Sequence, residues 1–304
     1  MASPEPMDVD SFVDSLPFNR FHLLVMILCT LLTAIDGYEL YVVGWVLPDL
    51  ARDLGVKPTA ITSAMIAQQI GMVVGAFLLP PFADRIGRTR VLMLCFTGML
   101  AAAIGILSSH SLLPFALWRF VAGLCGTAVI PILVTIASET APRRLRGTMS
   151  ASTIGGTMIG SLFGALMQGY VLEPFGWRGA FWIAALMPAI MLPLTWLLLP
   201  ETLRSLAARN PDDPALQPLA RRMQPAGAAP VTVIAAPRPV RTGNHTLAVL
   251  AQILGPDMRL KTLLMWAITS SSYIFVTAGT WKTTIFKDVI GLSWKMVATV
   301  NGAN

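Results

Sequence analysis

Apolar runs that contain no Asp, Glu, Lys or Arg recur along this sequence. The longest of them are 58–83, 91–118, 120–138, 147–172, 179–200 and 262–281. Each is about as long as the roughly 20 helical residues that cross the hydrocarbon core of a bilayer. The pattern therefore predicts an all-α membrane protein.

Short polar connections separate the predicted membrane spans. We predict seven spans at 21–47, 59–82, 91–108, 112–137, 149–172, 179–199 and 263–281, with an eighth beginning near Ser293. Segment 207–240 is rich in Pro and Ala and lacks the apolar period of a helix, which is typical of a linker. The predicted organisation is a cytoplasmic tail (1–20), a six-helix bundle (21–202), a cytoplasmic linker (203–258) and the start of a second bundle (259–304).

Composition and charge agree with a membrane protein. Hydrophobic residues make up 55% of the 304 residues and charged residues only 12%, which is unusual for a soluble protein. The net charge of +6 comes from basic residues spread over the connections rather than gathered on one face, so nucleic-acid binding is not predicted. The connections richest in Arg follow the second, fourth and sixth spans, which predicts a cytoplasmic N-terminus.

Three ionisable residues lie well inside predicted spans. Asp36 and Glu39 belong to the run AIDGYELYVVG of the first span, and Arg119 lies in the fourth. A charged residue at the centre of a membrane helix costs about 2.5 to 3.5 kcal/mol on insertion scales, so it usually faces a partner or a polar cavity. Because Asp36 and Glu39 are three residues apart, they share one helical face.

Two interpretations of these charges are open. In the structural one, Asp36 or Glu39 pairs with Arg119 and holds two helices together. In the functional one, the carboxylates line a pathway and take up a proton, because burial favours the uncharged form of a carboxyl group. The functional interpretation is our prediction.

Other polar and aromatic residues of these spans are candidates for substrate contacts. Tyr38, Tyr41 and Trp118 could stack on a ring, and Gln68 of the second span could form hydrogen bonds at membrane depth. The sequence contains no phosphate-binding loop, metal-ligand cluster or nucleophile triad. We therefore expect neither an enzyme nor a cofactor or metal site.

The connection between the second and third spans reads PPFADRIGRTR. It resembles the Gly-x-Leu-Ala-Asp-Arg-x-Gly-Arg motif of the major facilitator superfamily, although Pro80 and Phe82 replace the first Gly and the Leu. The residues that match are Ala83, Asp84, Arg85, Gly87 and Arg88.

Further similarities to this superfamily follow in order along the chain. Arg119 and Gly123 resemble its fourth-helix Arg-x-x-x-Gly motif, and the segment from Glu139 to Arg146 resembles the loop that follows. Pro200-Glu201-Thr202 resembles the end of its sixth helix.

Within the superfamily, AIDGYELYVVG resembles the first-helix Asp-Gly-Tyr/Phe-Asp signature of the aromatic acid:proton symporters. Asp36, Gly37 and Tyr38 match, and Glu39 replaces the second Asp. The resemblance implies proton-coupled uptake of a benzoate-type or hydroxybenzoate-type acid across the inner membrane by a multi-pass symporter. It also implies that Asp36, Glu39 and Arg119 couple protons to transport, while Asp84, Arg85, Gly87, Arg88, Glu139 and Arg146 form a cytoplasmic gate.

Two alternatives remain. One is a drug or metabolite exporter of the same fold. The drug antiporters of the superfamily have the motif Gly-x-x-x-Gly-Pro-x-x-Gly-Gly in the fifth helix, and Gly156, Gly160 and Gly164 match it in part. Ser161 stands in place of its Pro. The other is a fragment that does not transport by itself, because members of the superfamily continue for four more helices beyond the eighth. The expected partners are the aromatic acid, protons and the lipid bilayer. On the fragment interpretation, the missing C-terminal helices are also needed for function.

Overall fold

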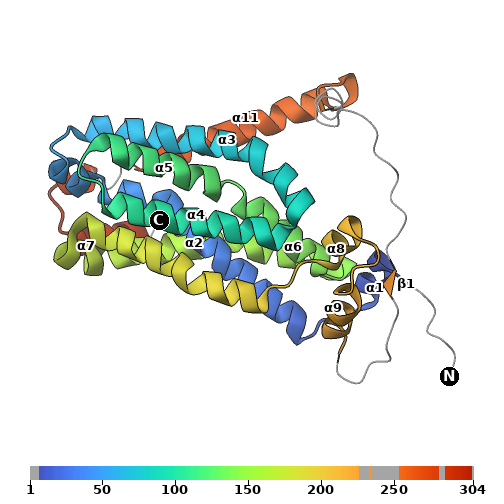
Figure 1. Ribbon diagram of the computed structural model, residues 1–304. Helices are drawn as coiled ribbons and strands as arrows, with labels where there is room; N and C mark the ends of the chain where they lie inside the picture. Colours follow the sequence, from blue (N-terminus) through green and yellow to red (C-terminus); the bar gives the residue numbers. More distant parts are fainter. Residues whose placement is uncertain (1–6, 226–232, 235–252, 281–284, 303–304) are drawn as a thin grey trace.

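Long helices run side by side and form a bundle, and a small cap of short elements lies at one end of it (Figure 1). The computed structural model describes residues 7–225, 233–234, 253–280 and 285–302. The bundle consists of α2 (Arg20–Asp53), α3 (Thr62–Ile86), α4 (Arg88–Leu107), α5 (Leu112–Gly126), α6 (Val129–Thr140) and α7 (Arg146–Leu198), with the short helices η1 (Pro58–Ile61) and η2 (Arg143–Leu145) in its connections. It is followed by α11 (Pro256–Thr280), η3 (Ile285–Val289) and α13 (Trp294–Gly302), of which α13 packs against α7.

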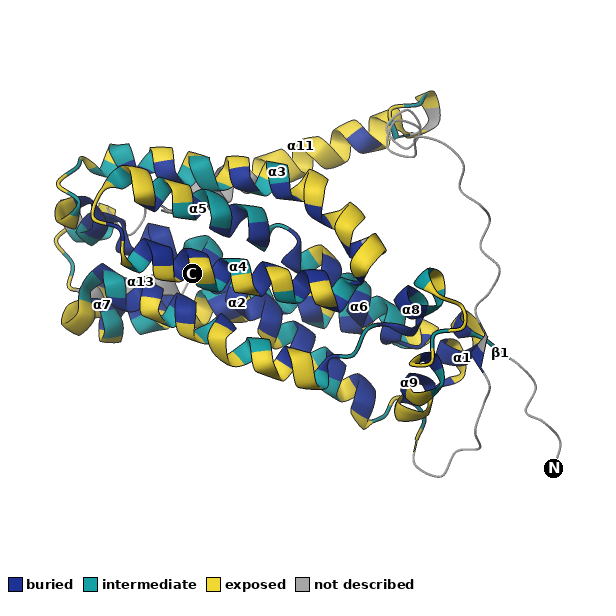
Figure 2. Cartoon of the chain, viewed as in Figure 1, coloured by how far each residue is buried: buried dark blue, intermediate teal, exposed yellow. Residues whose placement is uncertain are grey.

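The bundle has the lengths and the surface of a membrane protein. Five segments of the described residues are long and apolar enough to cross a bilayer: Arg20–Asp53, Pro58–Ala83, Arg88–Leu107, Leu112–Thr140 and Arg143–Leu198. Large apolar side chains such as Phe77 and Trp182 are exposed on the outside, whereas the inner faces of the helices are buried (Figure 2). Because such a surface suits lipid and not water, the prediction of an all-α membrane protein is confirmed.

The fourth predicted span, 112–137, is not one continuous helix. α5 ends at Gly126, and α6 begins at Val129 after a turn at Thr127 and Ala128. Pro131 explains the break, because the proline ring has no N–H and clashes with the carbonyl four residues earlier, here that of Thr127.

The fifth and sixth predicted spans correspond to the two helical parts of α7, which lie on either side of a kink at Gly176. Gly176 interrupts α7 with φ of 60° and ψ of −165°, a conformation outside the helical region. Only glycine adopts such angles readily, so the chain reverses direction at this residue. The first span is also longer than predicted, because α2 continues past Leu47 to Asp53.

Glycines allow α2 and α7 to cross at close range. A Cβ atom at Gly156 or Gly160 would collide with the backbone of Thr30 or Ala34. The hydroxyl of Thr33 donates a hydrogen bond of 2.5 Å to the carbonyl of Thr153 at the same crossing. Small residues spaced by four therefore serve helix packing here.

The cap joins the N-terminal segment to the segment that follows α7. It consists of β1 (Met7–Asp8), α1 (Val9–Ser15), α8 (Leu203–Arg209), α9 (Leu216–Met223) and β2 (Val233–Ile234), with β1 parallel to β2. Ion pairs of 2.6 Å connect Asp10 with Arg204 and Asp14 with Arg146. Residues 7–15 of the N-terminal tail are thus a folded part of the cap.

One expectation about the linker is wrong. Segment 207–240 does contain a helix, α9, whose buried residues Leu216, Leu219, Ala220 and Met223 follow the period of an amphipathic helix. The pattern covers only two turns, so it does not stand out among the surrounding prolines.

We expect Phe12→Ala to detach α1 from the cap. Phe12 is 1% exposed, and truncating a buried Phe to Ala costs about 3 to 5 kcal/mol. Faster trypsin cleavage after Arg221 and Arg222 would report the loosened cap. Ser11→Ala, on the exposed face of α1, is the matched control, and equal cleavage rates for both variants would contradict the prediction.

Candidate functional site

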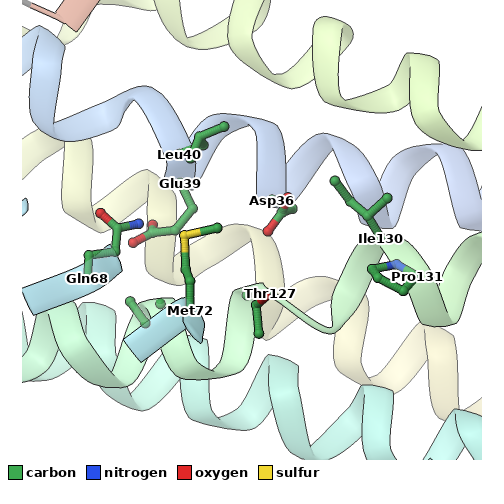
Figure 3. A pocket seen from close by; sticks show the side chains of 11 residues that line it. Asp36, Glu39, Leu40, Gln68, Met72, Thr127, Ile130 and Pro131 are labelled. Atoms are coloured by element: carbon green, nitrogen blue, oxygen red, sulfur yellow. The ribbon is translucent and has the colours of Figure 1, made fainter. Parts of the chain in front are cut away.

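A cavity of about 260 Å³ lies within the bundle between α2, α3, α5 and α6 (Figure 3). Its walls combine charged or polar groups with apolar side chains and glycine backbone, as in many small-molecule sites. The lining residues are Asp36, Glu39, Leu40, Gln68, Met72, Ala122, Gly123, Gly126, Thr127, Ile130 and Pro131.

Arg119 holds a buried ion pair at one end of this cavity. Its side chain is 0% exposed, and its Nη1 donates a hydrogen bond of 2.6 Å to Oε1 of Glu39. Its Nη2 donates to Oε1 of Gln68 and, at 3.4 Å, to the carbonyl oxygen of Glu39. The arginine thereby ties α5 to both α2 and α3.

Gln68 fixes this arrangement from α3. Its side-chain oxygen accepts from Arg119, and its backbone carbonyl lies so close to Gly123 that a Cβ atom there would collide with it. Glycine at position 123 therefore lets the two helices approach closely enough for the hydrogen bond to form.

Asp36 lies one turn of α2 away from Glu39 and also faces the cavity (Figure 3). Arg119 pairs with Glu39 and not with Asp36. Within the part of the chain that the structure describes, no hydrogen-bond or ion-pair partner is found for the Asp36 carboxyl group. Of the two carboxylates on this face, Asp36 is therefore the one open to a ligand or a proton.

Thr127 lies at the cavity where α5 ends, and sequence reasoning did not single it out. Its methyl group packs against Gly75 of α3, and its neighbour Gly126 lies beside Asp36, whose Oδ1 is 3.2 Å from the position of an added Cβ atom. The signal available in the sequence was Pro131, because a proline disturbs the helix at the residue four positions before it.

The three aromatic residues predicted to contact substrate lie outside the lining of this cavity. Tyr38 faces α7 and donates a hydrogen bond of 2.8 Å to the carbonyl of Ala180. The ring of Tyr41 stacks on Trp45, and that of Trp118 packs over Gly105 of α4. Among the four predicted contacts, only Gln68 lines the cavity.

Most predicted gate residues lie at the end of the bundle near the cap. Arg88 forms an ion pair with Glu139, which also accepts a hydrogen bond of 2.7 Å from Thr202. Arg146 does not join Glu139, because it pairs with Asp14 of α1 instead. The predicted charge cluster is therefore divided into two parts.

Gly87 lies between α3 and α4 with φ of 110°, a value that favours glycine. The turn it makes brings the backbone N–H of Arg88 to Glu201, at 2.9 Å from its Oε1. Arg85 is exposed. The side chain of Asp84 lies outside the described part of the structure.

The cavity, its buried ion pair and the Arg88–Glu139 contact at the cap end lie in a segment that matches a known protein family. Residues 29–303 match the Major Facilitator Superfamily. The chain belongs to this superfamily. The resemblance noted in the second-to-third connection and in the fourth helix is thereby confirmed.

Curated members of the superfamily are similar over nearly the whole chain. A gallate transporter of Pseudomonas putida is 31% identical over 98% of this chain and 65% of its own length. A 4-hydroxybenzoate transporter of Acinetobacter baylyi is 27% identical over 97% of this chain and 65% of its own length. The chain thus spans about two thirds of the length of these relatives.

Solved structures share the fold. A D-xylose–proton symporter superposes with a TM-score of 0.62 at 15% identity and covers 92% of this chain and 65% of its own. The partially occluded inward-open xylose transporter of E. coli gives 0.59, also at 15% identity, over 93% of this chain and 67% of its own. At this level of identity the likeness establishes the fold alone.

Proposed function

We propose that this protein is a secondary transporter that takes up an aromatic carboxylate together with protons by alternating access. The observation that carries the proposal is a small cavity inside a membrane bundle whose walls hold a partnerless carboxylate, Asp36, beside a buried Glu39–Arg119 pair. Transporters of this fold place their sites near the middle of the membrane between two six-helix halves. On this proposal, the residues that line the cavity form the part of the transport site that the first half contributes.

The charges of the site support proton coupling. Two carboxylates and one guanidinium carry one net negative charge, and an arriving carboxylate would add a second. Like charges in a site removed from water repel one another strongly, and protonation of a carboxylate relieves the repulsion. We propose that Asp36 takes up the coupling proton, while Glu39 keeps Arg119 in place until the substrate anion competes for it.

The proposed substrate class rests on the cavity and on the relatives. The apolar walls suit one aromatic ring, and the side-chain amide of Gln68 at one end can donate a hydrogen bond to a carboxylate, with the buried Arg119 behind it. The relatives that match over most of this chain are named as gallate and 4-hydroxybenzoate transporters. We therefore propose a single-ring aromatic acid.

We further propose that the cap lies in the cytoplasm and that the membrane is the inner membrane. The support is the concentration of Arg in the connections at the cap end. There, the Arg88–Glu139 pair would hold one conformational state closed and would separate when the cytoplasmic side opens.

Uptake of labelled 4-hydroxybenzoate by cells that produce the full-length protein tests this function. We expect uptake that stops when the proton gradient is collapsed and that is lost in Asp36→Asn. Undiminished proton-coupled uptake by Asp36→Asn would contradict the proton role. Outward flux alone would point to an exporter, and no flux of any aromatic acid would overturn the proposal.

A further inference from the structure

The cavity has two polar ends that lie at different depths along the helices. At the first end, Arg119, Glu39 and Gln68 are hydrogen-bonded to one another, and Gly123 packs against the backbone of Gln68. At the second end, Gly126 approaches Asp36. Glu39 and Asp36 are separated by about one turn of helix, a rise near 5 Å.

Thr127 completes the second end. The contact of its methyl group with Gly75 fixes the side chain against α3, and its hydroxyl faces the cavity on the side of Asp36 (Figure 3). For the described residues, no hydrogen-bond partner of this hydroxyl is found. Together with the carboxyl group of Asp36, the second end therefore offers a donor and two kinds of acceptor without partners of their own.

Between the two ends the walls are suited to a ring. Met72 of α3 lies one turn after Gln68 and before Gly75, so its thioether is placed between the two levels (Figure 3). Methionine sulfur packs favourably on aromatic rings. Leu40 and Ile130 add further apolar surface.

We propose that Thr127, together with Asp36, reads a hydroxyl group on the substrate ring and makes the site selective for hydroxylated aromatic acids over benzoate. This inference rests on the proposed function and adds a specificity-determining residue to it. With the substrate carboxylate at the Gln68 end of the cavity, the opposite edge of the ring reaches the level of Asp36 and Thr127. A hydroxyl there donates to one of these groups and accepts from the other, whichever protonation state Asp36 adopts.

Unsubstituted benzoate is the poorer ligand because of what it leaves unpaired. Its bare ring edge would cover Asp36 and Thr127 and remove them from water without replacing the lost hydrogen bonds. Sites built to bond a substrate hydroxyl reject analogues that lack it for this reason. A hydroxyl next to the carboxylate, as in 2-hydroxybenzoate, stays at the wrong end of the cavity and gives no gain.

The test compares Michaelis constants for uptake of 4-hydroxybenzoate, 2-hydroxybenzoate and benzoate by the full-length protein. For the parent protein we expect a KM for 4-hydroxybenzoate roughly tenfold below those of the other two acids. In Thr127→Val, which keeps the shape but lacks the hydroxyl, the ratio of KM for benzoate to KM for 4-hydroxybenzoate should fall toward one. Thr127→Ser, which retains the hydroxyl, should keep the preference.

The possible outcomes distinguish failure of this inference from failure of the proposed function. Equal KM values for all three acids in the parent protein, or an unchanged ratio in Thr127→Val, would overturn the inference and leave aromatic acid uptake standing. Absence of uptake of every acid by the parent would overturn the proposed function as well. Because KM does not depend on the amount of folded protein, reduced production of a variant does not obscure the ratio.

Discussion

Replacing Arg119 by methionine is expected to abolish uptake and to lower the free energy of unfolding by about 3 to 5 kcal/mol. The guanidinium is 0% exposed and pairs with Glu39, which is 8% exposed. Without it, the Glu39 carboxylate stays buried without an opposite charge, and Gln68 loses its donor. Thermal unfolding in detergent and uptake by cells measure the two effects separately.

A double variant distinguishes the loss of the charge pair from a general disturbance. Glu39→Leu combined with Arg119→Met replaces the pair by apolar side chains, and such replacements of buried pairs are often neutral or stabilising. We expect the double variant to regain most of the lost stability while remaining inactive. If Arg119→Met alone unfolds like the parent protein, the pair does not stabilise the bundle in the way we infer.

Gly160→Ala is expected to lower the free energy of unfolding by about 1 to 3 kcal/mol, although it adds only one methyl group. The Cβ atom would collide with the backbone of Ala34, so α2 and α7 must move apart along their crossing. Asp36 and Glu39 lie on α2 close to this crossing, and a shift of α2 would displace both of them from the cavity. A lower unfolding temperature and reduced uptake are the measurements.

Gly155→Ala is the matched control on the same helix. A Cβ atom at Gly155 meets no neighbouring atom within 4 Å. Alanine is favoured over glycine in a helix by up to about 1 kcal/mol, so this variant should unfold at the same temperature as the parent or slightly above it. A similar response of both variants would mean that the α2–α7 crossing tolerates wider spacing than the structure indicates.

The cavity brings together residues that are far apart in sequence. Their arrangement decides which carboxylate pairs with Arg119 and which one faces the cavity without a partner among the described residues. The sequence places Asp36 and Glu39 on one helical face and Arg119 in another span, so a pairing is foreseeable. It does not say which of the two carboxylates pairs, because that depends on how α2 and α5 are rotated against each other. The structure joins Glu39 to Arg119 and leaves Asp36 facing the cavity.

The aromatic candidates show the limit of reasoning from proximity along the chain. Tyr38 is two residues from Asp36, yet it points to α7, because neighbouring positions in a helix face about 100° apart. Thr127 is remote from the carboxylates in sequence but lines the same cavity as Asp36, since Pro131 breaks the helix at that point and Gly126 leaves room. The helical period separates Tyr38 from Asp36 and Pro131 marks the break at Thr127, but which helices these residues meet depends on the tertiary packing.

Sequence alone determined that this is a multi-pass all-α membrane protein, roughly where its helices lie and to which superfamily it belongs. Hydrocarbon cannot satisfy backbone polar groups, so apolar runs of sufficient length have to be helices, and this constraint acts locally. Tertiary structure decided the pairing of Glu39 with Arg119, the inclusion of residues 7–15 in the cap and the position of Thr127 at the cavity. These features depend on the rotation and spacing of helices, which are set by close contacts such as those of Gly123 and Gly160 between segments distant in the chain.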